Sequence, residues 1–427
     1  MGSGENWQPP AIERMRDTGL NILYLQELVL KILYFGGFLT GYQVAESIKL
    51  PFTGIVQPVL ESLKKERAVE VKGQGGFGEG AYQYVITGIG IEKAREALER
   101  SQYAGPCPVP LEYYVASVIE QRRRIMVNPD LMDHALKNLV INQSVFDKVG
   151  PAVNSGRSIF LYGPPGNGKT TISEAVGRVV LGSGMYVPYA IDIDGQVVRV
   201  FDNVNHEVLE EPSFSGTGSG RERADPRWVK IRRPVIMVGG ELTLDGLDLV
   251  YDPINKFYEA PFQVKANGGM FLIDDFGRQQ VRPRDLLNRW IVPLEKQIDF
   301  LTLANGRKVE VPFDVLIVFS TNLEPRDLVD EAFLRRIRHK IEIIDPTYEE
   351  FREIFMRVAR AKGLPYDDKA LAYLLQEWYI KEDRNLRAVH PRDIISQMKD
   401  IASYLGIPFQ MTPELLDRAC EAYFVEL

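Results

Sequence analysis

The sequence has 427 residues, of which 45% are hydrophobic and 26% are charged, so the chain is long enough for two or three domains with ordinary globular cores. Its formal net charge of -7 at pH 7 argues against a protein that coats nucleic acid, and its two cysteines are too few for a disulfide framework or a zinc site. Because no apolar run approaches the roughly 20 residues of a membrane span, we expect no membrane insertion, and the low cysteine count favours the reducing cytoplasm.

Residues 20 to 100 have the pattern of a compact helical unit that ends in a hairpin. Apolar residues at helical spacing predict a first helix that ends at Gly36, and Thr40 with Gln43 forms a capping box that opens a second helix. A third helix follows, with apolar residues up to Leu63. Two alternating segments joined by a glycine-rich tip then predict a hairpin. Three helices followed by a hairpin resemble a winged-helix domain.

The charges of this unit bear on the kind of partner it binds. A winged helix that binds DNA would place its third helix in the major groove. The third helix instead mixes cations with carboxylates, namely Lys64, Lys65, Arg67, Glu61 and Glu66. Because phosphate contacts dominate DNA affinity, this nearly neutral surface favours a protein-docking or self-assembly module. DNA binding stays an alternative that is not favoured.

The segment from Tyr103 to Pro110 is rich in proline and glycine, and we interpret it as the linker to the next unit. Residues 111 to 142 then have a largely helical pattern. They include a short basic run at Arg122, Arg123 and Arg124, which we interpret as a solvated helix face.

A glycine-rich loop near the middle of the chain carries the strongest signal in the sequence. Gly163, Gly168, Lys169 and Thr170 have the spacing of a phosphate loop. The apolar run before the loop predicts a buried strand, and the apolar positions after it predict a helix. The N–H groups of such a loop, its lysine and the helix N-terminus bind phosphate oxygens, and its hydroxyl binds Mg2+. We therefore predict an ATP and Mg2+ site lined by Gly163, Pro164, Pro165, Gly166, Asn167, Gly168, Lys169, Thr170 and Thr171.

Two further apolar strands are predicted to end at the same site. The run MFLIDD ends in two carboxylates, of which Asp274 is placed to hold Mg2+ with Thr170, and Asp275 is placed to orient the attacking water. The run VLIVFSTN ends in Asn322, which is placed to contact the water or the terminal phosphate. Because open parallel sheets bind ligands at the carboxyl ends of their strands, these segments should converge on one crevice.

These motifs resemble those of the AAA+ ATPase superfamily over residues 111 to 427. The phosphate loop resembles Walker A, MFLIDD resembles Walker B, and STN resembles sensor 1. The segment DEAFLRRI, residues 330 to 337, resembles the one that carries an arginine finger, which implies a finger at Arg336 or at its neighbour Arg335. The segment HPRD resembles sensor 2, which implies that Arg392 contacts the nucleotide from a helical lid.

Two details refine the resemblance. A predicted hairpin around Asn305 and Gly306 is similar to that of the branch with a hairpin before sensor 1, which includes MoxR-like ATPases and bacterial enhancer-binding activators. More closely, the chain resembles bacterial chaperone-like ATPases associated with pilus assembly. In one departure, Asp275 stands where the superfamily has a glutamate. Its carboxylate is one carbon-carbon bond short, and because about 1 Å of misplacement can cost on the order of 100-fold in rate, the departure argues against brisk hydrolysis.

The span from residue 184 to 267 is longer than the sheet requires. Its first part predicts paired strands that turn at Asp194 and Gly195. The small-residue loop from Phe214 to Gly220 is interpreted as an exposed surface loop, with a substrate-touching loop as the alternative that the resemblance suggests. Upstream of the phosphate loop, position alone suggests the adenine pocket at residues 139 to 143.

The sequence thus predicts a winged-helix-like α+β domain at residues 1–105, a P-loop AAA+ α/β domain with a parallel sheet at 106–344, and a helical lid at 345–427. The middle domain carries an insertion at about 184–267. We expect a cytoplasmic Mg2+-dependent ATPase that assembles as a homo-oligomeric ring of six subunits and remodels an unidentified protein or other macromolecular partner. Two alternatives stay open, a DNA-bound regulator and a slowly hydrolysing, nucleotide-gated scaffold.

Overall fold

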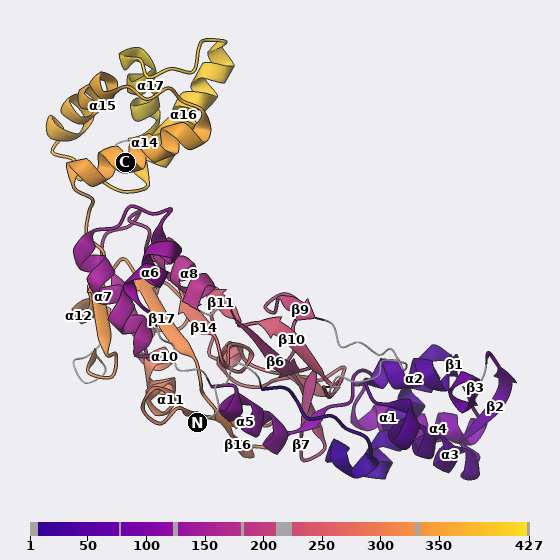
Figure 1. Cartoon of the computed structure of the whole chain (residues 1–427). Coiled ribbons are helices and arrows are strands. Elements are labelled where there is room, and N and C mark those ends of the chain that lie inside the picture. Colours follow the sequence, from indigo (N-terminus) through magenta and orange to yellow (C-terminus); the bar gives the residue numbers. More distant parts are fainter. Residues whose placement is uncertain are drawn as a thin grey trace.

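The structure is a computed structural model, and Figure 1 shows a helical N-terminal unit, a strand-rich centre and a C-terminal helical bundle that follows strand β18. It describes residues 7–76, 78–122, 127–180, 183–210, 224–328 and 334–424. Within these ranges, no helix combines the length and the apolar character that crossing a membrane requires.

The N-terminal unit has the helices and the hairpin that its sequence predicts. Its elements are α1 (Ile22–Gly36), β1 (Phe38–Thr40), α2 (Gly41–Ile48), α3 (Gln57–Lys65), β2 (Val69–Gln74), β3 (Tyr82–Ile86) and α4 (Gly88–Arg100). The antiparallel sheet has the order β1-β3-β2. In the predicted capping box, the Gln43 N–H donates to the Thr40 hydroxyl at 3.2 Å, and the Thr40 N–H donates to Gln43 Oε1 at 2.8 Å. The unit also contains a helix after the hairpin, α4, which the sequence pattern did not predict.

Two small sheets lie between this unit and the central sheet (Figure 1). Their strands are β4 (Val109–Pro110), β6 (Gly184–Pro188), β7 (Ala190–Ile193), β8 (Gln196–Arg199), β9 (Val208–Glu210), β10 (Trp228–Arg232), β12 (Val250–Asp252) and β13 (Phe257–Glu259). The strand orders are β6-β10-β9 and β12-β13-β8-β7-β4. Strands β7 and β8 form the predicted hairpin, whose turn residues Asp194 and Gly195 have φ values of 52° and 81°, as a tight hairpin turn requires.

The predicted linker is packed into the protein rather than exposed. Its last two residues are strand β4, which pairs with β7. The Cys107 side chain is fully buried, and the Cys107 N–H donates to the Ile48 carbonyl of α2 at 2.8 Å. Proline and glycine content indicated a connection here, but its burial depends on strands that come much later in the chain.

A buried ion pair ties the N-terminal unit to these strands. The Arg227 side chain is 0% exposed and donates to both carboxylate oxygens of Asp225 at 2.8 to 3.1 Å. Its Nη1 donates to the carbonyls of Thr18 at 2.8 Å and Pro108 at 3.2 Å. One side chain therefore joins the start of the chain, the linker and the segment before β10.

The central sheet has five parallel strands in the order β11-β14-β17-β5-β18. They are β5 (Ile159–Tyr162), β11 (Val235–Val238), β14 (Met270–Ile273), β17 (Leu316–Thr321) and β18 (His339–Glu342). Strand β11 lies within the predicted insertion at 184–267, so this span supplies the edge strand of the central sheet as well as strands outside it. Strand β11 pairs with β14. Its apolar run is short, and the sequence did not indicate which strand it would pair with.

Helices cover both faces of the central sheet. Successive side chains of a strand point to opposite faces, so neighbouring residues of β5 pack in different cores. Leu161 packs in the core with α6 (Pro129–Leu136), α7 (Gln143–Asn154) and α8 (Lys169–Val180). Phe160, the preceding residue, packs in the core on the other face. That core includes residues of α10 (Pro283–Arg289) and α11 (Ile291–Lys296), and α9 (Phe262–Lys265) lies beside it. The predicted fold class, a P-loop parallel sheet between helices, is confirmed.

The remaining elements follow the predicted order. Strands β15 (Ile298–Thr302) and β16 (Lys308–Pro312) form the hairpin before β17, and α5 (Leu111–Glu120) packs against β16. The C-terminal bundle encloses its own apolar core. Its helices are α14 (Tyr348–Lys362), α15 (Asp368–Leu375), α16 (His390–Leu405) and α17 (Pro413–Tyr423). The short helical turns are Met15–Thr18, Phe52–Val56, Glu79–Ala81, Asp245–Leu247, α12 (Pro325–Leu328) and Gln376–Ile380.

Candidate functional site

The glycine-rich loop connects the carboxyl end of β5 to the first residue of α8. Gly163 has a φ of 132°, and a Cβ there would lie 2.3 Å from the Ile343 carbonyl oxygen. Gly166 has a φ of 81°, and a Cβ there would lie 2.7 Å from Val389 Cγ1. Both positions therefore need glycine, since an L side chain would be strained in this backbone and would clash. The loop leads into the positive end of the α8 dipole, where anions bind.

Lys169 links the loop to strand β17. Its ammonium group donates to the carbonyls of Gly163 and Pro164, each at 2.9 Å, and to Asn322 Oδ1 at 2.7 Å. Burial lowers the pKa of Lys169, and the nearby carboxylates of Asp274 and Asp275 partly oppose that shift. The predicted loop cation and the predicted residue at the end of β17 are thus in direct contact.

Thr170 and Asp274 form the oxygen-rich part of the site. The Thr170 hydroxyl donates to Asp274 Oδ2 at 2.8 Å. Asp274 is held in turn through its backbone, since its N–H donates to the Val238 carbonyl of β11 at 2.8 Å and its carbonyl accepts from Gln279 at 3.0 Å. One hydroxyl and one carboxylate fit Mg2+, which is commonly bound through one or two carboxylates together with phosphate oxygens and water.

Asp275 lies in a tight turn that is tied to β17. Its φ is 49°, a left-handed conformation that aspartate tolerates better than most residues. Its carboxylate accepts a hydrogen bond from the Asn322 amide at 3.2 Å. The next N–H, that of Phe276, donates to the Ser320 carbonyl at 2.7 Å. The structure therefore brings Asp275 and Asn322 together at the ends of neighbouring strands.

The two arginines that the resemblance assigns to a finger lie in a different place. Arg336 Nε donates to Glu295 of α11 at 2.6 Å, and its side chain is 31% exposed. The neighbouring Arg335 is exposed. Because α11 packs through Leu294 against the core on the face of the sheet opposite α8, the pair of Arg336 with Glu295 lies on the α11 side of the sheet. Residues 330 to 333 of the predicted segment lie outside the described residues.

Arg392 lies near the start of α16, where its Nε donates to Asp393 at 2.9 Å and its side chain is 65% exposed. The bundle instead meets the phosphate loop through the residues just before α16. The Val389 N–H donates to the Gly166 carbonyl at 2.9 Å, and Arg387 forms an ion pair with Asp345. Arg387 was missed because only HPRD matches a known motif. The available signal was a second arginine shortly upstream of it.

The segment suggested for adenine lies under helix α14 of the bundle. Asn142 donates to Glu350 at 3.2 Å, and Arg357 donates to the Lys137 and Leu139 carbonyls at 3.0 and 3.4 Å. The predicted loop at 214 to 220 lies outside the described residues. Residues 139 to 143 are therefore next to the bundle, where Leu139 and Asn142 contact side chains of α14.

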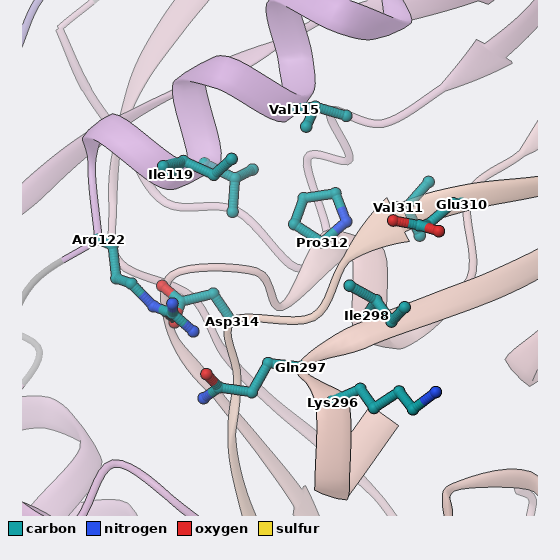
Figure 2. Close-up of a pocket in the computed structure, with 11 residues that line it drawn as sticks. Val115, Ile119, Arg122, Lys296, Gln297, Ile298, Glu310, Val311, Pro312 and Asp314 are labelled. Carbon is teal, nitrogen blue, oxygen red and sulfur yellow. Dashed lines mark hydrogen bonds and ion pairs between the residues drawn. The ribbon is translucent and has the colours of Figure 1, made fainter. Parts of the chain in front are cut away.

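A cavity of about 270 Å³ lies away from this site, between α5 and the β15–β16 hairpin (Figure 2). Figure 2 shows its apolar wall, which includes Val115, Ile119 and Pro312, and its polar end, where Arg122 pairs with Asp314 at 2.8 Å. A larger cavity of about 770 Å³ lies between the N-terminal unit and β8. Residues of the phosphate loop line neither cavity.

Comparisons with known proteins add the following. A family model described as a domain of unknown function (DUF8689) matches residues 347–422, which form most of the C-terminal bundle. The search of curated proteins gave no match. Similar solved structures include NtrX from Brucella abortus in complex with ADP, with 13% identity and a TM-score of 0.38 over 73% of this chain and 61% of that chain. They also include the RuvB Holliday junction branch migration motor of Thermotoga maritima, with 14% identity and a TM-score of 0.38 over 67% of this chain and 70% of that chain.

The chain therefore spans about three fifths of the NtrX chain that it resembles.

Proposed function

We propose that this chain is a Mg2+-dependent ATPase of the AAA+ type that works as a ring and remodels a macromolecular partner. The observation that carries the proposal is the convergence of three strand ends. Lys169 follows β5, Asp275 follows β14 and Asn322 follows β17, and direct hydrogen bonds join Asn322 to both other side chains. Ligands of open parallel sheets bind at this edge.

Each residue of the site has a distinct part in the proposed reaction. The loop N–H groups and Lys169 bind the phosphates, and Thr170 with Asp274 holds Mg2+. The metal ion, when bound, neutralises charge that develops on the phosphoryl oxygens. Asp275 and Asn322 orient the attacking water. Since phosphoryl transfer depends mainly on positioning and on charge stabilisation, these groups account for the catalysis that one subunit provides.

A slowly hydrolysing, nucleotide-gated scaffold is the second candidate function. It is favoured by Asp275, whose short carboxylate is already hydrogen-bonded to Asn322 at 3.2 Å. A short side chain in a tight turn reaches less far toward an attacking water than a glutamate would. In this case ATP binding, rather than turnover, would set the state of the protein.

We propose a protein rather than DNA as the partner of the N-terminal unit. The Gln57 amide on α3 donates to Glu61 at 3.4 Å and also to Glu79 near the hairpin tip, so two carboxylates lie beside this amide. Two of the lysines nearby are already paired, Lys72 with Glu70 at 3.3 Å and Lys93 with Glu66 at 2.5 Å. Converging carboxylates repel phosphates, which supports protein docking over a DNA-bound regulator.

We also propose that the protein works in the cytoplasm. Both cysteines, Cys107 and Cys420, are buried and free, and burial raises the pKa of each thiol to about 12. Such thiols are protonated and unreactive at neutral pH. This arrangement suits a reducing compartment, where neither thiol needs a disulfide partner.

The proposed function is tested by nucleotide binding and turnover in the full chain. Lys169→Ala removes the loop cation and should abolish, or nearly abolish, binding of a fluorescent ATP analogue and Mg2+-dependent phosphate release. The matched control is Lys381→Ala, which removes an exposed lysine paired with Glu377 on the C-terminal bundle and should change neither measurement. Undiminished affinity in Lys169→Ala would remove the phosphate-loop assignment and the ATPase proposal with it.

A further inference from the structure

Three residues from three separate segments meet at the phosphate loop. They are Asn167 of the loop, Asp345 of the connection between β18 and α14, and Arg387 of the connection before α16. Asn167 Nδ2 donates to Asp345 Oδ1 at 2.6 Å, and the same carboxylate oxygen forms an ion pair with Arg387 Nη1. On its other side, Asn167 Oδ1 accepts from the Ala388 N–H at 3.1 Å. A single amide in the loop therefore bonds both to the segment that leads into the C-terminal bundle and to the connection before helix α16 within it.

These contacts hold the positive charge of Arg387 close to the loop that is proposed to bind phosphate. A Cβ on Gly166 would lie 3.8 Å from Arg387 Cβ, so the side chain of Arg387 begins next to the loop. Burial is the main cause of the lowered pKa of Lys169, and the charge of Arg387 lowers it further. The Arg387 side chain is only 21% exposed. Two cations thus flank one loop, while Arg392 is turned toward Asp393.

Carboxylate and phosphate oxygens are equivalent partners for a guanidinium group, which can donate to either through two parallel N–H groups. A nucleotide on the loop would bring phosphate charge near Asp345 and offer Arg387 a second anionic partner. Asp345 would keep its hydrogen bond from Asn167 after Arg387 had left. The carboxylate would then still have a donor, which limits the cost of breaking the ion pair.

On this basis we propose that Arg387 is a phosphate-binding residue that acts within its own subunit, and that Asp345 competes with the nucleotide for it. Asp345 is then a positioning residue, and Asn167 is the donor that keeps it in place. Nucleotide binding moves Arg387 from Asp345 to phosphate, so occupancy of the loop changes how the bundle is held. This inference rests on the proposed function and names the residues that connect the loop to the bundle.

The test is a double-mutant cycle on nucleotide affinity in the full chain, with a fluorescent ADP analogue as the probe. Arg387→Gln should weaken binding about tenfold, the size expected for a charge-assisted hydrogen bond to phosphate. Asp345→Asn should tighten binding several-fold, because it removes the competing charge while its amide oxygen still accepts from Asn167. In the Arg387→Gln background, Asp345→Asn should have no effect, because the cation for which the carboxylate competes is gone.

Several results would overturn the inference. If Asp345→Asn weakens binding as much as Arg387→Gln does, the pair only supports the loop. If Arg387→Gln has no effect while Arg392→Gln weakens binding, the bundle contacts the nucleotide through Arg392 alone. A matched control is Arg352→Gln with Asp368→Asn, an exposed ion pair of 2.8 Å on the same bundle, which should leave affinity unchanged. Thermal unfolding without nucleotide shows whether each variant is folded.

The same experiment separates this inference from the proposed function. If Lys169→Ala abolishes binding and the Arg387 cycle shows no coupling, the loop binds nucleotide and only the role of Arg387 is wrong. If Lys169→Ala binds as tightly as the unaltered chain, the proposed function fails first.

Discussion

At the residue scale, two adjacent carboxylates have different surroundings and different proposed tasks. Asp274 accepts from the Thr170 hydroxyl at 2.8 Å, next to the loop that is proposed to hold phosphates. Asp275 accepts from Asn322 at 3.2 Å and has a left-handed backbone. The turn between them sends one side chain toward α8 and the other toward β17. Metal binding and water orientation are thus assigned to neighbouring residues without overlap.

Asp275 gives a prediction about rate. Asp275→Glu lengthens the side chain by one methylene, and because about 1 Å of misplacement can cost on the order of 100-fold, turnover should rise about tenfold or more with little change in ATP affinity. Steady-state phosphate release and equilibrium nucleotide binding measure the two quantities. Asp275→Asn is the control, and it should lower turnover while keeping affinity. A glutamate variant no faster than the unaltered chain would show that reach does not limit the reaction.

At the element scale, strands that are distant in sequence are joined by a few buried polar contacts. The Arg227 side chain pairs with Asp225 and donates to the carbonyls of Thr18 and Pro108, so one arginine joins the segment before α1, the linker and the segment before β10. Both charges are almost completely removed from solvent. Such a pair is costly to break from one side, because the remaining charge stays buried without a partner.

Removing the arginine should therefore destabilise the N-terminal half. Arg227→Met is expected to lower the free energy of unfolding by about 3 to 5 kcal/mol, because Asp225 is left buried and unpaired. Urea denaturation followed by tryptophan fluorescence measures the loss. The double variant Arg227→Met with Asp225→Leu should recover part of it. Equal losses in the single and double variants would mean that the carbonyl contacts of Arg227, rather than its ion pair, carry the stability.

At the scale of the whole molecule, the proposed ring depends on an arginine that pairs with α11 rather than with the phosphate loop of its own chain. Arg336 is paired with Glu295 on the face of the sheet opposite α8. The AAA+ resemblance implies that this arginine, or Arg335, completes the site of the next subunit. An arginine supplied in trans can contribute roughly 10^3 to 10^5 in rate, which far exceeds what an exposed surface ion pair contributes to folding.

Arg336→Ala should therefore remove most turnover while ATP affinity and the fold stay nearly intact. Mixing Arg336→Ala subunits with Lys169→Ala subunits should restore partial activity, because some interfaces then pair an intact nucleotide site with an intact finger. Phosphate release from the mixture, with mixed assembly verified by size and by differential labelling, is the measurement. If mixed rings form and stay as inactive as their parts, the finger is not Arg336. If Arg335→Ala instead loses turnover and regains part of it in mixed rings, the finger is Arg335.

The proposed preference of the N-terminal unit for a protein over DNA is tested on the full chain. The full chain should bind a labelled DNA duplex no more tightly than non-specific proteins do, with a dissociation constant of about 10^-4 to 10^-6 M at physiological salt. The reason is the pair of carboxylates, Glu61 and Glu79, that accept hydrogen bonds from Gln57. Fluorescence anisotropy at low and moderate salt measures the affinity. Tight binding with a steep salt dependence would favour the DNA-bound regulator.

The sequence by itself determined the local structures and the loop chemistry of this protein. The capping box at Thr40, the tight turn at Asp194 and Gly195, and the phosphate-loop spacing all depend on residues close to one another in the chain. Local geometry follows from local sterics and hydrogen bonding, so patterns of a few residues are enough to predict it. Short continuous apolar runs likewise predicted the buried strands that end at the site.

Only the tertiary structure decided which distant segments meet. The placement of β11 at the sheet edge, the burial of the linker around Cys107 and the contact of Arg387 with Asp345 each join residues far apart in sequence. No local pattern marks such partners, because their contacts are selected by packing and charge pairing of the complete fold. The motif HPRD pointed to Arg392, whereas the fold brought Arg387 to the loop. The reason is that the connection before α16, which contains Arg387, lies next to Gly166, whereas Arg392 lies within α16 and pairs with Asp393.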